Sequence, residues 1–187
     1  DLMVEKGFCV IRYDHRDTGK SSKFDFSQNP YTLQDLADDI IAVMDGFDMK
    51  KVHAVGLSMG GTLVQVAAID HPDRFLSATV MLTAALDVDF AGNINRAYSG
   101  EPNPMGLPSP KREVLDLLAQ RTLATGTLDE ELEKRTREWL ALSGPKAIVM
   151  PEEFQNWEVR AIDHAGTMAQ PMNHALAAPI PIARGKE

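Results

Sequence analysis

The sequence predicts an α/β fold in which parallel strands alternate with helices. Three observations support this prediction. Apolar runs of strand length alternate with segments of helical spacing between residues 7 and 82, and the first run is continuously apolar, which is typical of a strand covered on both faces. A Gly-x-Ser-x-Gly motif centred on Ser58 separates a strand-like run from a helix start. The order strand, helix, strand, helix, strand favours a parallel sheet with right-handed crossovers and helices on both faces.

The first predicted strand covers residues 7–14. Its apolar centre includes Cys9, which we therefore expect to be buried. The next helix is predicted to begin after Thr32, because Asp35 follows three residues later and the two form a capping-box pattern. Gly46 predicts the end of this helix. Its apolar positions keep helical spacing: Leu33, Leu36, Ala37, Ile40, Ile41 and Met44.

The serine motif lies inside the next strand and helix pair. Residues 51–55 predict a strand, residues 61–70 a helix, and residues 78–82 a third strand. In a nucleophile elbow the chain turns sharply at the serine between such a strand and helix, so that the hydroxyl projects into the active site. Gly56 and Gly60 fit this arrangement if a Cβ at either position would collide with the neighbouring strand or helix. The motif therefore makes Ser58 a candidate nucleophile, and a turn that only packs is the alternative.

The pattern changes after the third strand. A Pro- and Gly-rich stretch, residues 91–110, leads into three segments with helical spacing or composition, residues 113–123, 128–143 and 151–168. We interpret residues 1–86 as a core that carries the elbow and residues 87–187 as a helical lid. The charged run 129–135 is interpreted as the solvated face of a helix.

Composition limits the classes of partner. A chain of 187 residues with 44% hydrophobic residues has the size and apolar content of one soluble domain. The net charge of −8 argues against nucleic acid or an anionic membrane surface as the main partner. No apolar run approaches the ~20 residues of a membrane span, and we expect a cytoplasmic location. We expect no metal and no cofactor, because no cluster of His, Asp and Glu has ligand spacing and no phosphate loop is present.

Three segments together resemble the α/β-hydrolase superfamily: residues 13–21, 56–61 and 70–74. Residues 86–90 and 157–166 resemble, within that superfamily, the aclacinomycin methylesterase-like serine esterases, named after an enzyme that acts on an anthracycline polyketide. The resemblance covers essentially the whole chain. It implies that Ser58 attacks an ester carbonyl to form an acyl-enzyme and that the backbone N–H of Met59 is one donor of the oxyanion hole. It also implies that the loop of residues 14–21 lies beside the active site.

The resemblance further implies parts that the sequence does not contain. The family has strands before residue 7, a second oxyanion donor on an early loop, and an acid and a histidine that follow strands beyond the lid. We therefore expect an incomplete fold, an internal segment of a longer chain, and a homo-oligomer or strand exchange is the alternative that would complete the sheet. Within the chain, Asp87 or Asp89 and His164 or His174 satisfy the order serine, acid, histidine, and they are the in-chain candidates.

The function expected from these observations is a serine hydrolase that cleaves a carboxylic ester of a small molecule, with a methyl ester or lactone of a polyketide-like compound as one candidate substrate. Two alternatives stay open. The same fold can serve a non-catalytic binding protein or an inactive fragment in which the elbow is only architecture. An acyltransferase or perhydrolase could use the same serine, and product analysis would separate these from a hydrolase.

Overall fold

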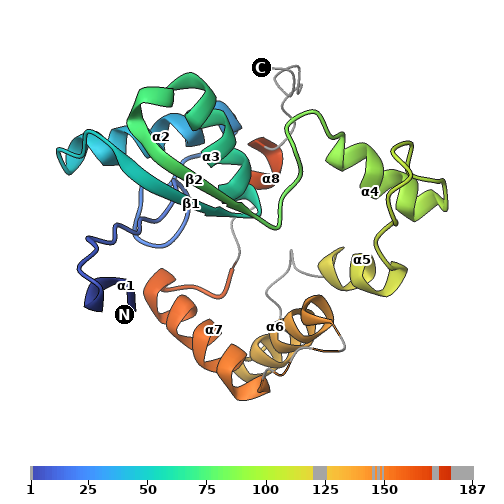
Figure 1. Cartoon of the computed structure of the whole chain (residues 1–187). Coiled ribbons are helices and arrows are strands. Elements are labelled where there is room, and N and C mark those ends of the chain that lie inside the picture. Colours follow the sequence, from blue (N-terminus) through green and yellow to red (C-terminus); the bar gives the residue numbers. More distant parts are fainter. Residues whose placement is uncertain are drawn as a thin grey trace.

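The computed structural model describes residues 2–119, 126–144, 146, 148, 150–169 and 173–177. Its elements follow one another in the order shown in Figure 1: α1 (Leu2–Glu5), α2 (Leu33–Gly46), β1 (Val52–Leu57), α3 (Met59–Asp70), the 3-10 helix η1 (Pro72–Arg74), β2 (Phe75–Met81), α4 (Phe90–Ser99), α5 (Arg112–Ala119), α6 (Leu128–Ser143), α7 (Pro151–Ala165) and α8 (Asn173–Ala177).

Strands β1 and β2 form a parallel pair joined through α3, as the sequence predicts. Val55 stands opposite Thr79, and Leu57 at the end of β1 stands opposite Met81 at the end of β2. Both predicted strands are confirmed with shifted bounds, since β1 continues to Leu57 and β2 already begins at Phe75. The carboxyl ends of the two strands therefore coincide, and this edge of the sheet is where the serine motif lies.

The main hydrophobic core lies between helices α2 and α3, and Tyr31, Leu86 and Ala177 of α8 complete it. Helix α3 packs against both strands and α2 packs against α3 (Figure 1). Leu36 and Leu63 are fully buried between these elements. Along β1, Ala54 is buried and Val55 is exposed, which is the alternation expected when one face of a strand is covered.

Helix α2 begins as the sequence predicts. The Thr32 hydroxyl accepts a hydrogen bond from the Asp35 backbone N–H at 3.3 Å, and the Thr32 backbone N–H donates to the Asp35 carboxylate at 2.7 Å. This reciprocal capping box satisfies two N–H groups that a helix start otherwise leaves without partners. The helix ends at Gly46, which confirms the predicted stop.

The predicted strand at residues 7–14 is wrong. Residues 8–15 have no regular secondary structure, and Phe8 and Val10 are exposed. Cys9 is exposed as well, so its expected burial is also wrong. A β-strand exists only through hydrogen bonds to a neighbouring strand, and in the described part of the chain the sheet contains β1 and β2 alone. The apolar run therefore lacks the partner that would have made it a strand.

Helices dominate after β2. Helices α5, α6 and α7 confirm the three predicted helical segments, and the bounds of α6 agree with those predicted, while residues 120–123 of the first segment lie outside the described residues. Helix α4 was not expected. Asp89 caps its start, because the Asp89 carboxylate accepts the Gly92 N–H at 2.8 Å, and Gly100 in the left-handed conformation caps its end. Figure 1 shows α4 to α7 following one another in an arc beside the β1–β2 unit. Within the described ranges, no helix has the length and apolar character needed to cross a bilayer.

The charged run on α6 is not simply a solvated face. Glu131 and Arg135 are buried, whereas Asp129, Glu130 and Glu133 are exposed. The packing of α7 against α6 explains this difference, because Glu158 on α7 accepts a hydrogen bond from the Arg135 guanidinium at 2.7 Å. The buried guanidinium is thus paired with carboxylates from two helices, as a buried charge requires.

Candidate active site

Ser58 occupies a sharp turn between β1 and α3. Its backbone has φ 53° and ψ −122°, a conformation that residues with a side chain rarely adopt. The turn is fixed from both sides. The Ser58 N–H donates to the Met81 carbonyl at 2.9 Å, and the Ser58 carbonyl accepts the N–H groups of Gly61 and Thr62 at 2.9 and 3.2 Å. A strained residue held by its surroundings between a strand end and a helix start is the geometry of a nucleophile elbow.

The glycines around Ser58 have unequal roles. A Cβ built on Gly56 would clash with the Gly60 carbonyl, so the expectation for Gly56 is confirmed. The expectation for Gly60 is wrong, because a Cβ at that position meets nothing within 4 Å. Gly61 is the second tight position instead, since its Cβ would lie 2.7 Å from the Thr83 methyl group. The first turn of α3 thus lies close to β1 and to the segment after β2, and the absence of a Cβ at Gly56 and Gly61 allows these two contacts.

The side chain of Ser58 is exposed, and its hydroxyl has no hydrogen-bond partner among the described residues. Met59 is the first residue of α3, and its backbone N–H likewise has no acceptor within the described chain. The first N–H groups of a helix lack intrahelical acceptors and carry partial positive charge. An exposed hydroxyl beside such a donor can attack a carbonyl whose oxygen then receives the donor's hydrogen bond.

The four in-chain candidates for acid and base lie elsewhere. Asp89 caps α4, and Asp87 is exposed beside it. His174 on α8 places Nε2 2.8 Å from the Arg16 carbonyl, and His164 on α7 places Nε2 2.7 Å from the Asp14 carboxylate. In the described part of the chain, no hydrogen bond connects any of these four side chains to Ser58.

Asp14 organises the loop of residues 14–21. Its carboxylate accepts the Lys20 N–H at 2.9 Å, and its carbonyl accepts the Ser21 hydroxyl at 2.6 Å. The backbone hydrogen bond from Lys20 and the side-chain hydrogen bond from His164 hold the pKa of Asp14 below its ordinary value, although burial acts in the opposite direction. Sequence reasoning placed this loop near the site but did not identify Asp14 as the partner of His164.

Arg16 and Asp17 attach the same loop to the core. The Arg16 guanidinium makes two hydrogen bonds to Asp39 on α2, at 2.6 and 2.8 Å, and lies over the ring of Tyr31. Asp17, at φ 68°, accepts hydrogen bonds from the Phe24 N–H and the Tyr31 hydroxyl, both at 2.6 Å. Burial acts to raise the pKa of Asp17, but these hydrogen bonds outweigh it and lower the pKa. Both charged residues therefore hold structure and are not available as free catalytic groups.

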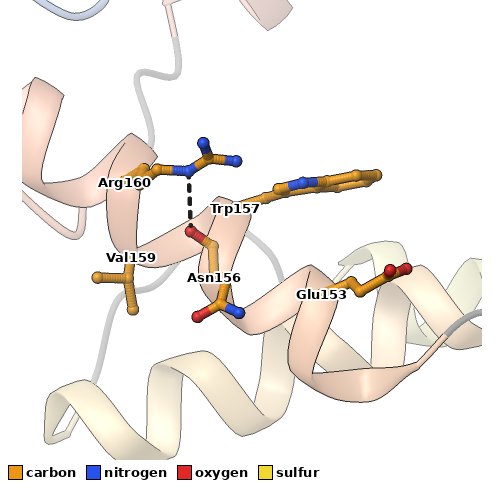
Figure 2. A pocket seen from close by; sticks show the side chains of 5 residues that line it. All are labelled: Glu153, Asn156, Trp157, Val159 and Arg160. Carbon is orange, nitrogen blue, oxygen red and sulfur yellow. Dashed lines mark hydrogen bonds between the residues drawn. The ribbon is translucent and has the colours of Figure 1, made fainter.

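Two cavities lie away from the elbow. One of about 500 Å³ lies along the outer side of α7, between Glu153 and Arg160, and Figure 2 shows that its lining residues come from that single helix. The other, of about 350 Å³, lies between the loop that contains Thr18 and the helices α6 and α7. Ser58 lines neither cavity. The candidate site is therefore assigned from the backbone conformation of Ser58 and from the Met59 N–H, which has no acceptor in the described chain. The size of a cavity alone does not identify a reaction.

Comparisons with known proteins identify the family of this chain. Residues 2–107 match the family described as alpha/beta hydrolase fold. Rhodomycin D methylesterase DauP of Streptomyces sp. (strain C5) is 44% identical over 187 residues, which are 100% of this chain and 63% of that protein. Rhodomycin D methylesterase DnrP of Streptomyces peucetius is 43% identical with the same coverage. A solved structure of a hydrolase from Pseudomonas aeruginosa PA01 has a TM-score of 0.46 and 22% identity, over 89% of this chain and 50% of that one. The chain thus spans 63% of the length of the two curated relatives.

Proposed function

Because the chain belongs to the alpha/beta hydrolase fold family, we propose that it carries the nucleophile, Ser58, of a serine esterase. The observation that supports this most directly is the Ser58 backbone at φ 53° and ψ −122°, immediately before the open N–H of Met59. Strained backbone of this kind clusters at functional sites, and in a nucleophile elbow it exposes the serine hydroxyl.

The proposed reaction has two steps. The Ser58 Oγ attacks the ester carbonyl carbon and gives its proton to a base, and the carbonyl oxygen becomes an oxyanion that accepts the Met59 N–H. The carbonyl then re-forms and the alcohol leaves with a proton. Water attacks the acyl-enzyme in the second step, which releases the carboxylic acid and restores the hydroxyl.

The proposed substrate is the methyl ester of a polyketide-like small molecule. The support is the pair of relatives whose names state that they act as methylesterases on rhodomycin D, at 44% and 43% identity over the whole of this chain. A lactone presents the same carbonyl chemistry and is a second substrate for assay. We propose that α4, α5, α6 and α7 form the lid, since these four helices follow β2, the strand beside the elbow, in sequence.

The catalytic base that accepts the Ser58 proton has two candidate sources, which mutation can distinguish. The resemblance to the family implies an acid and a histidine that follow the strands after the lid. The His164 and Asp14 pair is the in-chain alternative, because a carboxylate 2.7 Å from an imidazole nitrogen orients the ring as a catalytic base requires. In the structure this pair makes no hydrogen bond to Ser58, so its use would need α7 to move.

Labelling of the natural protein that contains this chain tests the proposal. A fluorophosphonate probe should modify Ser58, and Ser58→Ala should abolish the labelling. Ser109→Ala is the matched control, because Ser109 is exposed and lies outside the elbow. Loss of labelling in His164→Gln as well would assign the in-chain base. Labelling that is absent in the wild type, or unchanged in Ser58→Ala, would contradict the esterase and favour a non-catalytic binding protein.

A further inference from the structure

Leu82, the first residue after β2, has an unusual conformation. Its φ is 50°, and its side chain is 86% exposed. A left-handed backbone is unfavourable for leucine because the Cβ crowds the carbonyl oxygen. Among the described non-glycine residues with positive φ, the others are Asp17, Asp48 and Ser58, which are small and polar. The surrounding structure must therefore stabilise this conformation of Leu82.

The neighbours of Leu82 are fixed to the elbow on both sides. Before it, the Met81 carbonyl accepts the Ser58 N–H at 2.9 Å. After it, the hydroxyl oxygens of Thr83 and Thr62 lie 2.9 Å apart, and the Ala84 carbonyl accepts the Gln65 side-chain amide at 3.1 Å. Leu82 is thus held between two attachments to the elbow and the first turns of α3. These contacts stabilise a backbone that the leucine itself disfavours.

Leu82 lies beside the candidate nucleophile. The parallel register pairs Leu57 with Met81, so Ser58 and Leu82 are the next residues at the coinciding carboxyl ends of the two strands, which Figure 1 shows side by side. Ligands of open α/β sheets bind outside the carboxyl ends of the strands. An apolar side chain held in water at this point, at a cost in backbone energy, has a reason if a ligand covers it.

We propose that Leu82 is a specificity-determining residue that contacts the apolar part of the acyl group attached to Ser58 during the reaction. The inference rests on the proposed esterase function. The Leu82 isobutyl group favours esters whose acyl chain carries apolar carbon beyond the carbonyl, because the chain and the leucine leave water together. An acetyl group is too short to gain from this contact.

The test compares p-nitrophenyl octanoate with p-nitrophenyl acetate as substrates of the natural protein. Leu82→Ala is expected to lower the ratio of the octanoate to the acetate kcat/KM by roughly tenfold to fiftyfold, the upper figure applying if all three lost carbons are fully buried against the acyl chain. The kcat/KM for acetate is expected to fall by much less than the kcat/KM for octanoate, since the acetyl group carries no apolar chain that contacts Leu82. Leu82→Met, which keeps the apolar volume, should restore the ratio. Leu76→Ala is the matched control, because Leu76 is an exposed leucine near the opposite end of β2.

The outcomes separate the two claims. If the wild type hydrolyses acetate in a Ser58-dependent manner but Leu82→Ala leaves the ratio unchanged, or lowers both kcat/KM values equally, the assignment of Leu82 is wrong and the esterase stands. If neither ester is hydrolysed in a Ser58-dependent manner, the proposed function is wrong and the role of Leu82 fails with it.

Discussion

The imidazole Nε2 of His164 lies 2.7 Å from the Oδ2 of Asp14, although the two residues are 150 positions apart in the sequence. The contact joins α7 to the loop of residues 14–21, and the same carboxylate oxygen accepts the Lys20 N–H. A single carboxylate therefore accepts a hydrogen bond within its own loop and attaches helix α7 to that loop.

This carboxylate predicts a pH dependence of stability. The native pKa of Asp14 lies below the ordinary value of 3.8, first because of the Lys20 hydrogen bond and then because of His164. A lowered native pKa stabilises the folded state at pH values above the unfolded pKa, and this stabilisation is lost as the pH falls through the native pKa. Asp14→Asn should therefore reduce the free energy of unfolding by about 1 kcal/mol at pH 6, and by less at pH 3.

Urea unfolding at the two pH values measures this effect. Asp73→Asn provides the comparison, because Asp73 is an exposed aspartate in η1. If Asp14→Asn and Asp73→Asn showed the same pH dependence, the hydrogen bonds to Asp14 would not contribute to stability.

The glycines of the elbow should respond differently to alanine. Gly56→Ala should destabilise the protein by about 1–3 kcal/mol, because its Cβ would overlap the Gly60 carbonyl. Gly60→Ala is the matched variant within the same motif, and it should be neutral or stabilising by up to about 1 kcal/mol, since it lies in α3 with open space at its Cβ. Thermal unfolding of both variants is the measurement. Equal destabilisation would show that Gly60 also has a close neighbour.

The buried charge cluster between α6 and α7 should be sensitive to truncation. Burial acts to lower the pKa of Arg135, but the hydrogen bonds that its guanidinium donates to Glu158 and Glu131 outweigh it and raise the pKa. Arg135→Met would leave the buried Glu131 and the partly buried Glu158 without their guanidinium, at a cost of about 3 kcal/mol, the lower end of the range for a broken buried pair because Lys134 still pairs with Glu131.

Arg137→Met is the control for this prediction, because Arg137 is exposed on the same helix, and it should change the free energy of unfolding by no more than about 0.5 kcal/mol. Unfolding followed by helical circular dichroism compares the two. A small effect of Arg135→Met would mean that α6 and α7 pack without the ion pairs.

Loss of the capping box of α2 should lower the free energy of unfolding by less than loss of Arg135 does, because it affects only the start of one helix. Thr32→Ala removes the hydroxyl that accepts the Asp35 N–H, and it should cost about 1 kcal/mol. Thr127→Ala should cost about the same, because Thr127 and Glu130 form the equivalent box at the start of α6. Chemical denaturation is the measurement, and a loss well below that of typical caps in both variants would show that tertiary packing sets these helix starts.

Features that depend on neighbouring residues could be predicted from the sequence. The start of α2 at Thr32 and the strand, serine and helix order around Ser58 depend on spacings of a few residues, and the structure has both. Helix α4 was missed because the Pro- and Gly-rich stretch that contains it masked the cap at Asp89.

Features that depend on distant partners could not be predicted. The run at residues 8–15 is apolar enough for a strand, but a strand also needs a neighbour to pair with. The burial of Arg135 depends on Glu158 from another helix, and the partner of His164 comes from the other end of the chain. The openness at Gly60 depends on which element approaches it, and a motif carries no such information.

The hydrogen bonding at the elbow should make the adjacent backbone amides of Ser58 and Met59 exchange their hydrogens at very different rates. The Ser58 N–H is bonded to the Met81 carbonyl and should exchange slowly, whereas the Met59 N–H has no acceptor in the described chain and should exchange fast. A boronic acid bound at Ser58 would offer an oxygen to Met59 and should slow that amide alone. Exchange at the Ser58 amide therefore reports whether the turn is intact, and exchange at the Met59 amide reports whether a ligand is bound, without any measurement of turnover.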